Sequence, residues 1–550
     1  MALETELKLA LTAADVPQLL AHALLAAQPP RVVRLRNTYF DTPELALLAR
    51  RVAVRERQIG RQTLLTVKTA GAVTGGLARR GEWEAPTTPG HFHFAALVTD
   101  DDALAGELQT LATALVPVFS TDFSRRIWLL QHRGAQIEVA LDRGTIRATP
   151  AGASRHRVLP ILELELELKH GPVDALFSLA GKLGKAARLQ PMTVSKAQRG
   201  YALFLDQSPA PVKATPLQLE RQQTPLAAFQ HIASACLTQL EANESGLLKS
   251  DNPEYLHQAR VAVRRLRAAL RLFAPVLPRP FVKHWGPAWR ALGQVLGEAR
   301  DWDVFCESTL SELTATLPRR DAARLQRWAR AQASDARSEV RRHLLGKRHP
   351  ARLLAFSRAL QQLNAAEPSI AKAKPAGAGS QRGTGLKRWA RRQLKAREQV
   401  LRQRIRKADP RDDDARHRVR IDAKKLRYSL EFFTSLWPAD QVHAYAKALA
   451  RVQELLGLMN DRVTARARLA AAASDGKTHA RAAAPTPTQP TPPAPNAPAV
   501  ALLRDRLAVL LGHDAQRLPS VLKALRGTPM PWRKQAAGGK GAKAPRRQKK

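Results

Sequence analysis

Charged side chains alternate with apolar ones in several short segments near the amino terminus. Residues two apart share one face of a β-strand, so Glu4, Glu6 and Lys8 point to one side and the residues between them to the other. Segment 162–168 repeats the pattern with glutamates alone, and segment 52–57 repeats it with arginines. A wetted, charged face is ordinary for one antiparallel strand, but acidic and basic strands together in one small region are less ordinary.

Such faces could bind a metal ion and phosphate if the sheet closes with them inside. Isolated buried charges are too costly to keep, so an ionic ligand would have to fill the interior. Carboxylates from two strands offer the oxygen ligands that Mg²⁺ and Mn²⁺ prefer, and arginine and lysine hold phosphate oxygens. The pattern therefore predicts a barrel whose interior is a phosphate-binding tunnel. The chain has no GxxxxGK[ST] loop, which excludes a P-loop ATPase, and no Ser/His/Asp arrangement.

The strands that would position these side chains lie within the first 207 residues. Period-two alternation marks them at residues 4–9, 52–57, 64–69, 136–142 and 162–168. Turn signals separate them, such as Asp-Arg-Gly at residues 142–144. The first part should therefore be an antiparallel sheet or barrel.

The remainder of the chain differs in charge and in periodicity. Residues 1–207 contain 25 basic and 20 acidic residues, whereas the following 343 contain 64 and 27, a formal charge of +37. After Pro216, Ala, Leu and Arg recur at helical spacing, which predicts an all-helical second part. Such a positive excess indicates a polyanionic partner. Aromatic residues are 5% of the chain, too few for a platform that stacks bases.

The helical part contains an internal duplication. Residues 257–273 align with residues 417–433, and residues 296–301 align with residues 456–461, each at an offset of 160. Two blocks that share one offset predict two copies of a helical bundle, packed with pseudo-twofold symmetry.

One helical face in each copy is basic, because spacings of three and four residues place its members on one side. The members are His257, Arg260, Arg264, Arg267 and Arg271 in the first copy and His417, Arg420, Lys424 and Arg427 in the second. Like charges repel, so a flexible phosphate chain is expected to neutralise this face. Neither histidine has the neighbours of a zinc site. A hydrogen bond to a backbone carbonyl is an alternative to phosphate contact for both.

Three segments lack the apolar residues that an ordered chain buries, so we expect them to be unstructured. They are residues 371–385, residues 474–498 and the basic tail 535–550. The predicted domains are residues 1–207 and 216–534, the second with repeats at about 225–365 and 386–534.

The first part resembles the CYTH superfamily of triphosphate tunnel enzymes, and within it the bacterial inorganic triphosphatases. The ExExK signature of that superfamily is matched by residues 4–8, Glu-Thr-Glu-Leu-Lys. Further motifs follow in order at residues 39–43, 55–57, 66–69, 80–84, 123–125, 137–144, 163–168 and 195–201. The resemblance covers residues 1 to about 205. It implies an antiparallel β-barrel tunnel that hydrolyses inorganic triphosphate to diphosphate and phosphate with a metal ion.

The resemblance also implies roles for particular residues. The ligands of Mg²⁺ or Mn²⁺ are expected to be Glu4, Glu6, Glu163 and Glu165. The residues that bind triphosphate are expected to be Lys8, Arg55, Arg57, Lys68, Arg125 and Lys196. Asp142 is expected in the same ionic network, near a metal or orienting an arginine. With Glu4 and Glu6, the triphosphate-binding residues and Asp142 make up the expected catalytic set.

The second part resembles the CHAD domain, which often follows CYTH in one chain and is associated with binding inorganic polyphosphate. The basic faces carry this resemblance, together with residues 297–301 and 457–461. The residues implied to bind polyphosphate are His257, Arg260, Arg264, Arg267, His417, Arg420, Lys424 and Arg427.

Several alternatives stay open. The tunnel could hold phosphate with little turnover, as part of a polyphosphate-binding scaffold, or it could be an adenylyl cyclase or a thiamine or nucleoside triphosphatase. The basic helices could bind nucleic acid, although no specific nucleic acid is expected. Two cysteines and an amino terminus without a signal-peptide pattern predict a cytoplasmic protein, with polyphosphate granules as an expected location. Uncharged stretches of 18 or more residues occur at 222–240 and 482–503, but both are interrupted by polar or proline residues, so no membrane partner is expected.

Overall fold

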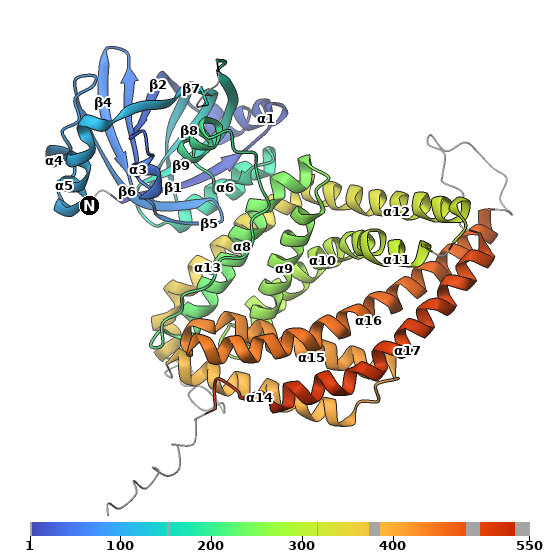
Figure 1. Cartoon of the computed structure of the whole chain (residues 1–550). Coiled ribbons are helices and arrows are strands. Elements are labelled where there is room, and N and C mark those ends of the chain that lie inside the picture. Colours follow the sequence, from blue (N-terminus) through green and yellow to red (C-terminus); the bar gives the residue numbers. More distant parts are fainter. Residues whose placement is uncertain (1–2, 151–153, 316, 373–384, 480–495, 534–550) are drawn as a thin grey trace, which may run out of the picture.

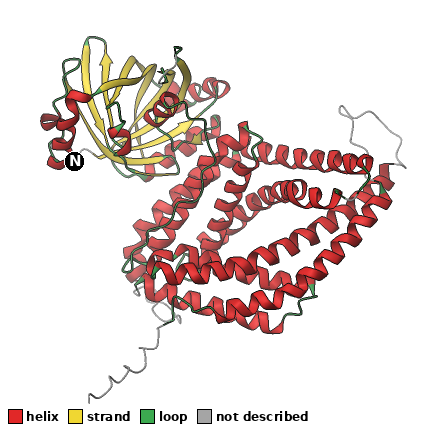
Figure 2. Cartoon of the chain, in the orientation of Figure 1, coloured by secondary structure: helices red, strands yellow, loops and turns green. Residues whose placement is uncertain are grey.

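The computed structural model describes residues 3–150, 154–315, 317–372, 385–479 and 496–533. A β-barrel domain comes first and an all-helical domain follows it (Figures 1 and 2). This arrangement confirms the predicted α+β architecture, with an antiparallel barrel followed by a helical bundle domain.

Eight antiparallel strands close the barrel, in the order β1-β9-β8-β7-β2-β3-β4-β6 and back to β1. Two short strands extend it at the edges, β10 beside β1 and β5 beside β6. The strands are β1 (Leu3–Ala10), β2 (Arg31–Asp41), β3 (Ala53–Ile59), β4 (Gln62–Lys68), β5 (Ala72–Thr74), β6 (Leu77–Pro86), β7 (Val116–His132), β8 (Ala135–Ala148), β9 (Arg157–His170) and β10 (Gln190–Pro191).

One predicted turn is wrong. Residues 142–144 do not turn, because β8 continues through them to Ala148. Gly144 serves a different purpose, since a Cβ atom there would lie only 2.1 Å from the backbone oxygen of Asp122 on the neighbouring strand. The glycine permits this close approach of two strands rather than a change of direction.

The barrel is apolar outside and charged inside, and alternation along each strand is the reason. Leu7 and Leu9 of β1 are fully buried on the outer face, where they join Leu164 and Leu166 of β9 in a core beneath α6. The residues between them point inward. The helices of this domain are α1 (Val16–Leu20), α2 (Ala23–Ala26), α3 (Ala46–Ala49), α4 (Phe94–Leu97), α5 (Asp102–Leu111), α6 (Asp174–Ala186) and α7 (Lys196–Phe204).

The second domain is built from long helices (Figure 1). They are α8 (Pro225–Lys249), α9 (Pro253–Phe273), α10 (Arg279–Val304), α11 (Leu310–Thr314), α12 (Arg319–Leu345), α13 (Arg348–Lys372), α14 (Leu386–Lys407), α15 (Asp413–Phe432), α16 (Ala439–His479) and α17 (Ala497–Gly527), with a π-helical turn at Phe305–Thr309. Helices α8 to α10 correspond to α14 to α16 at the offset read from the sequence. Within the described ranges, every helix is too short or too polar to cross a membrane.

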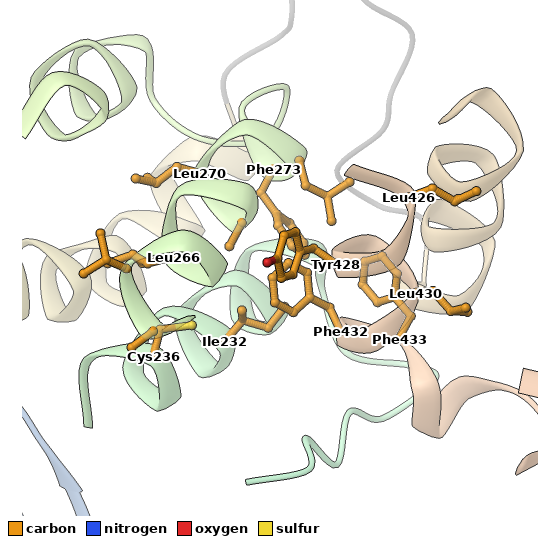
Figure 3. Packing of buried hydrophobic residues seen from close by; sticks show 14 of the residues in the cluster. Ile232, Cys236, Leu266, Leu270, Phe273, Leu426, Tyr428, Leu430, Phe432 and Phe433 are labelled. Carbon is orange, nitrogen blue, oxygen red and sulfur yellow. The ribbon is translucent and has the colours of Figure 1, made fainter. Parts of the chain in front are cut away.

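The two copies meet at an aromatic cluster (Figure 3). Phe273 and Phe433 are 160 residues apart, and their rings pack edge to face with centroids at 6.0 Å. Each also packs on an aromatic side chain of its own copy's first helix, Phe229 at 5.8 Å and Trp389 at 6.0 Å, again 160 residues apart. Equivalent residues in equivalent contacts are what a pseudo-twofold axis between α9 and α15 produces.

The segments predicted to be unstructured are shorter than expected. α16 extends to His479 and α17 begins at Ala497, so both ends of segment 474–498 are helical, and Lys372 still belongs to α13. Residues 474–479 are Ser-Asp-Gly-Lys-Thr-His, but they extend a helix that is already formed, and propagation of a helix costs less than its nucleation. The rest of these segments and the tail 535–550 lie outside the described residues.

The two domains share an extensive interface. Arg358 of α13 forms two hydrogen bonds of 2.6 Å with Asp174 of α6, and Leu354 joins the apolar core of the barrel. The turn between β5 and β6 lies against α13, and Gly75 has a φ of +60° there. Any Cβ at Gly75 would collide with Ser357. The helical domain is therefore seated on the strand edge where β5 and β10 extend the barrel.

Candidate active site

A cavity of about 1160 Å³ runs inside the barrel. Nine of the eleven residues predicted for catalysis or metal binding line its wall: Glu4, Glu6, Lys8, Arg55, Arg57, Lys68, Arg125, Glu165 and Lys196. Asp142 and Glu163 are fully buried directly behind that wall. The strand faces predicted from alternation thus converge on one site.

The first cluster joins β1 to β4 and β6. Lys68 Nζ donates to both oxygens of Glu4 at 2.9 and 3.0 Å, and Arg80 Nε donates to Glu4 at 2.8 Å. Arg80 also pairs with Glu6, so its guanidinium bridges the two acidic residues of the ExExK segment. Burial raises the pKa of Glu4, but the positive charges of Lys68 and Arg80 lower it by more, so the pKa stays well below its usual range.

The second cluster joins β7, β8, β9 and α7. Arg125 holds Asp142 with two hydrogen bonds of 2.7 Å and also contacts Glu165. Lys196, the first residue of α7, contacts Asp142 at 2.6 Å and Glu165 at 3.0 Å, and pairs with Glu163. Burial lowers the pKa of Lys196, yet these three carboxylates raise it well above its usual value.

The third cluster is the guanidinium pair of β3. Arg55 donates to the hydroxyl of Tyr39 at 3.3 Å, but no acceptor among the described residues lies within hydrogen-bond distance of its buried Nε and Nη2. Arg57 donates to Asn37 at 3.2 Å and pairs with Glu84 at 3.2 Å. Burial and the neighbouring Arg55 lower the pKa of Arg57 to about 10. Donors left without acceptors on a cavity wall suit an anionic ligand.

The chemistry of the donors also fits a hard divalent cation. Asp142, Glu163 and Glu165 each offer an oxygen, and these oxygens lie within 4.8 Å of one another. Such an all-carboxylate set suits Mg²⁺ or Mn²⁺. The group does not include Glu4 or Glu6, which pair with Lys68 and Arg80 in the first cluster.

Several cavity residues were not assigned a role from the sequence: Arg80, Glu82, Glu84, Glu138, Glu167 and Lys169. Glu167 shows that the signal was present, because it continues the alternation of β9 and pairs in register with Glu6 of β1. Arg199 of α7 was also missed. It contacts the buried Glu163 from outside the strand segments whose alternation was analysed.

A second cationic site lies between the two copies in the helical domain. Arg260 and Arg264 of α9 face Arg420 and Lys424 of α15, and the Arg264 guanidinium lies 5.2 Å from the ring centre of Tyr428. Nε of all three arginines is buried without a hydrogen-bond partner among the described residues. Burial, then Arg420, Arg264 and Arg260, lower the pKa of Lys424 to about 7.

The other residues predicted on these faces lie in different settings. His257 is half-buried, and burial and nearby arginines lower its pKa. Arg267 is partly buried, His417 is exposed, and Arg427 is exposed and engaged by Glu431 and Gln453. The centre of the site is therefore the four cations of α9 and α15.

Fold and sites together define a two-domain protein with an ion-lined barrel and a cationic helical domain. Residues 2–201 match the sequence model of the CYTH domain, and residues 231–470 match that of the CHAD domain. The chain is thus a CYTH domain followed by a CHAD domain, as the resemblance implied.

Similar proteins include an enzyme. The inorganic triphosphatase of Haemophilus influenzae is 35% identical over 207 residues, which cover 36% of this chain and 54% of the relative. The chain thus spans about half the length of this curated relative.

Two solved structures are also similar. One is the CHAD domain of the plant Ricinus communis, with 29% identity, 58% of this chain and 98% of that chain covered, and a TM-score of 0.48. The other comes from Hippeastrum and is described as a putative adenylyl cyclase that reveals a dominant triphosphatase activity. It has 18% identity, 36% and 95% coverage, and a TM-score of 0.27.

Proposed function

We propose that the barrel hydrolyses inorganic triphosphate in a metal-dependent reaction, and that the helical domain binds inorganic polyphosphate. In the hydrolysis, the oxygen of water bonds to a terminal phosphorus while the phosphoanhydride bond to the central phosphate breaks. Diphosphate, phosphate and a proton result. The similarity to an inorganic triphosphatase supports this substrate.

The observation that carries the proposal is the pair of arginines on β3. Arg55 has buried N–H groups without a hydrogen-bond acceptor among the described residues, and its nearest carboxylates are Glu82 at 3.7 Å and Glu84 at 4.0 Å. Besides Arg55 and Arg57, the cations that line the cavity include Lys8, Lys68, Arg80, Arg125 and Lys196. A linear phosphate chain supplies many acceptor oxygens in a row, and each guanidinium can take two of them.

The chain's own residues position and neutralise the substrate, which is most of what phosphoryl transfer requires. Arg55 and Arg57 would hold phosphate oxygens on one wall, and Lys68, Lys8, Arg125 and Lys196 would hold them on the others. Glu4, Glu6, Glu163 and Glu165 are the ligands of Mg²⁺ or Mn²⁺ that the resemblance implies, and Asp142 is a further candidate because its oxygen lies within 4.8 Å of those of Glu163 and Glu165. When bound, the metal supplies charge neutralisation and a water of lowered pKa.

Phosphate release from inorganic tripolyphosphate tests the enzymatic proposal. We expect release in the presence of Mg²⁺ or Mn²⁺, none after treatment with a chelator, and a loss of at least 100-fold in Glu4→Gln. Glu220→Gln, an exposed carboxylate outside the cavity, is the matched control. Equal rates in wild type and Glu4→Gln would favour a phosphate-holding scaffold instead. Cyclic AMP from ATP would identify an adenylyl cyclase.

The second half of the proposal is supported by the buried Nε groups of Arg260, Arg264 and Arg420, which have no hydrogen-bond partner in the part of the chain that the structure describes. Long-chain polyphosphate and DNA should be titrated against the full chain at one salt concentration, because both bind basic surfaces through phosphate. We expect polyphosphate to bind more tightly. Tighter binding of DNA or RNA would assign the cationic site to nucleic acid.

A further inference from the structure

The segment between the two domains, residues 208–224, contributes to the cavity of the barrel. Val212 and Thr215 line the same cavity as Lys8 and Lys196. Both residues follow the last helix of the barrel domain and precede α8, so they belong to the connector and not to the barrel. The cavity wall is therefore completed by chain outside the barrel.

The connector lies at one particular end of the cavity. Gly71, Val73 and Met192 line this end, where they follow or extend β4, β5 and β10. The opposite end is lined by Arg31, at the start of β2, and Lys169, at the end of β9. Because β5 and β10 also carry the interface with the helical domain, the connector closes the barrel on the side that faces that domain.

The helical domain fixes the connector in this position. Asn243 of α8 accepts a hydrogen bond from the backbone N–H of Val212 and donates one to its carbonyl oxygen, both at 2.9 Å. The Tyr255 hydroxyl donates to the carbonyl oxygen of Pro209 at 2.6 Å. Asn243 is completely buried, and its amide also donates to Gln239. A single buried amide thus holds both polar backbone groups of Val212.

We propose that the connector is a specificity-determining wall of the triphosphate cavity, and that Asn243 is the positioning residue that holds it. This inference rests on the proposed function. The Val212 side chain, 41% exposed, limits the room for further phosphate groups at the end facing the helical domain. The length of phosphate chain that the barrel accepts is therefore set in part by a residue of the other domain.

The test compares kcat/KM for linear tetraphosphate with kcat/KM for tripolyphosphate in the full chain. Val212→Gly removes the side chain from the wall, and we expect the ratio of tetraphosphate to tripolyphosphate to rise at least threefold. Val212→Trp fills the same space, and we expect the ratio to fall at least tenfold. Asn243→Ala releases the backbone of Val212 and should change the ratio in the same direction as Val212→Gly.

Ser435→Ala is the matched control for Asn243→Ala. The Ser435 hydroxyl accepts from the backbone N–H of Leu219 at 2.9 Å and donates to its carbonyl oxygen at 3.1 Å. It therefore holds Leu219 of the connector with the same pair of hydrogen bonds that Asn243 makes with Val212. Leu219 lies away from the cavity and buries its side chain in the helical core. We expect Ser435→Ala to leave the substrate ratio unchanged.

Both Val212 variants change an exposed position, so they report even if Asn243→Ala fails to fold. A ratio equal to that of wild type in Val212→Gly and Val212→Trp overturns the inference while leaving the proposed function intact. If wild type hydrolyses neither chain, the proposed function fails. The wall is then tested by calorimetric binding of tripolyphosphate and tetraphosphate to the same variants, and unchanged relative affinities overturn it.

Discussion

The two cationic sites of this protein balance their charges in opposite ways. In the barrel, cations and carboxylates are interleaved, so Lys196 touches three carboxylates and Arg125 touches two. Between α9 and α15, four cations face one another, and burial together with the neighbouring cations lowers the pKa of Arg260, Arg420 and Lys424. Among the described residues, Asp301 pairs with Arg260 at 3.1 Å and Asp461 lies near Arg420 and Lys424, so two carboxylates accompany four cations. The barrel is thus internally neutralised, whereas the helical site is left with excess positive charge.

This difference indicates two kinds of ligand. A neutralised network is rigid and changes little in net charge when a metal and a short phosphate chain enter together, which suits positioning for a reaction. A site with excess positive charge gains mainly by neutralisation, so it suits a long polyanion that is held by charge and released by salt. Removing a compensating charge from the barrel, or a positive charge from the helical site, tests this difference.

The largest effect is expected from removing the most heavily paired cation of the barrel. Lys196→Met leaves Asp142, Glu163 and Glu165 with less compensation in a buried site. Removing one partner of a buried ion pair costs about 3–5 kcal/mol. We expect this loss in the free energy of unfolding, measured with denaturant, and a loss of about 10²–10³-fold in triphosphate hydrolysis. Lys182→Met, on the exposed face of α6, should change neither. If Lys196→Met had the same free energy of unfolding as wild type, the three carboxylates would not depend on Lys196 for compensation.

The next largest effect is expected from neutralising the helical site. Replacing Arg260, Arg264 and Arg420 together by glutamine should lower polyphosphate affinity at least about 100-fold and reduce its dependence on salt. Because Asp301 and Asp461 are fewer than the cations beside them, folding stability should fall less than it does in Lys196→Met. Affinity is measured by titration at two or more salt concentrations.

A matched triple variant keeps the same change of charge elsewhere. Arg319, Arg320 and Arg526 are exposed, and their replacement by glutamine should have a smaller effect on polyphosphate affinity. Equal losses in both triple variants would show that net charge alone binds the polyanion. The four cations of α9 and α15 would then not form a distinct binding site.

Crowding of like charge also predicts a pH dependence. Lys424 has a pKa of about 7, so in the free protein it gains its charge as the pH falls through neutrality. Polyphosphate affinity should therefore rise from pH 8.5 to pH 6, by roughly three- to tenfold, and Lys424→Met should reduce this slope. Lys425→Met is the control, because Lys425 is exposed and pairs with Asp422 at 2.8 Å. The same slope in Lys424→Met as in wild type would contradict the assignment.

Much of this architecture could be predicted from local sequence pattern. Alternation placed Glu4, Glu6 and Lys8 inside the barrel because strand geometry leaves only two faces. The offset of 160 predicted a duplication, which the packing of Phe273 on Phe433 now displays. In both cases the prediction rests on the number of residues between positions, which is a property of the sequence alone.

What could not be predicted depends on contacts between distant segments. Arg358 and Asp174 are 184 residues apart, and nothing local to either marks the interface that they join. Likewise, Val212 lies in a polar connector without periodicity, so its place on the cavity wall follows only from Asn243 of another domain. Arg80 was part of a recognised motif, but only the fold shows that it bridges Glu4 and Glu6.

The smallest expected effect concerns the interface that joins the two sites. Glu241 of α8 is buried with its carboxylate near the backbone of Gly75, and no side chain among the described residues donates a hydrogen bond to it. Burial, and then the nearby Glu244, raise the pKa of Glu241 well above its usual value. Glu244 is itself engaged by His349 and Gln190, each at 2.6 Å, so it does not relieve Glu241.

This arrangement should make the interface weaken as the pH rises. Above the ordinary pKa of a glutamate, the unfolded chain loses the proton that folded Glu241 keeps, so stability falls as the pH approaches the raised value. Glu241→Gln cannot ionise, and we expect its melting temperature to exceed that of wild type by about 2 °C or more at pH 8 and to differ little at pH 5. Glu220→Gln, on the exposed connector, should follow wild type at both values. A wild-type melting temperature as high at pH 8 as that of Glu241→Gln would mean that Glu241 is stabilised as an anion, and the interface would then resemble the compensated barrel rather than the helical site.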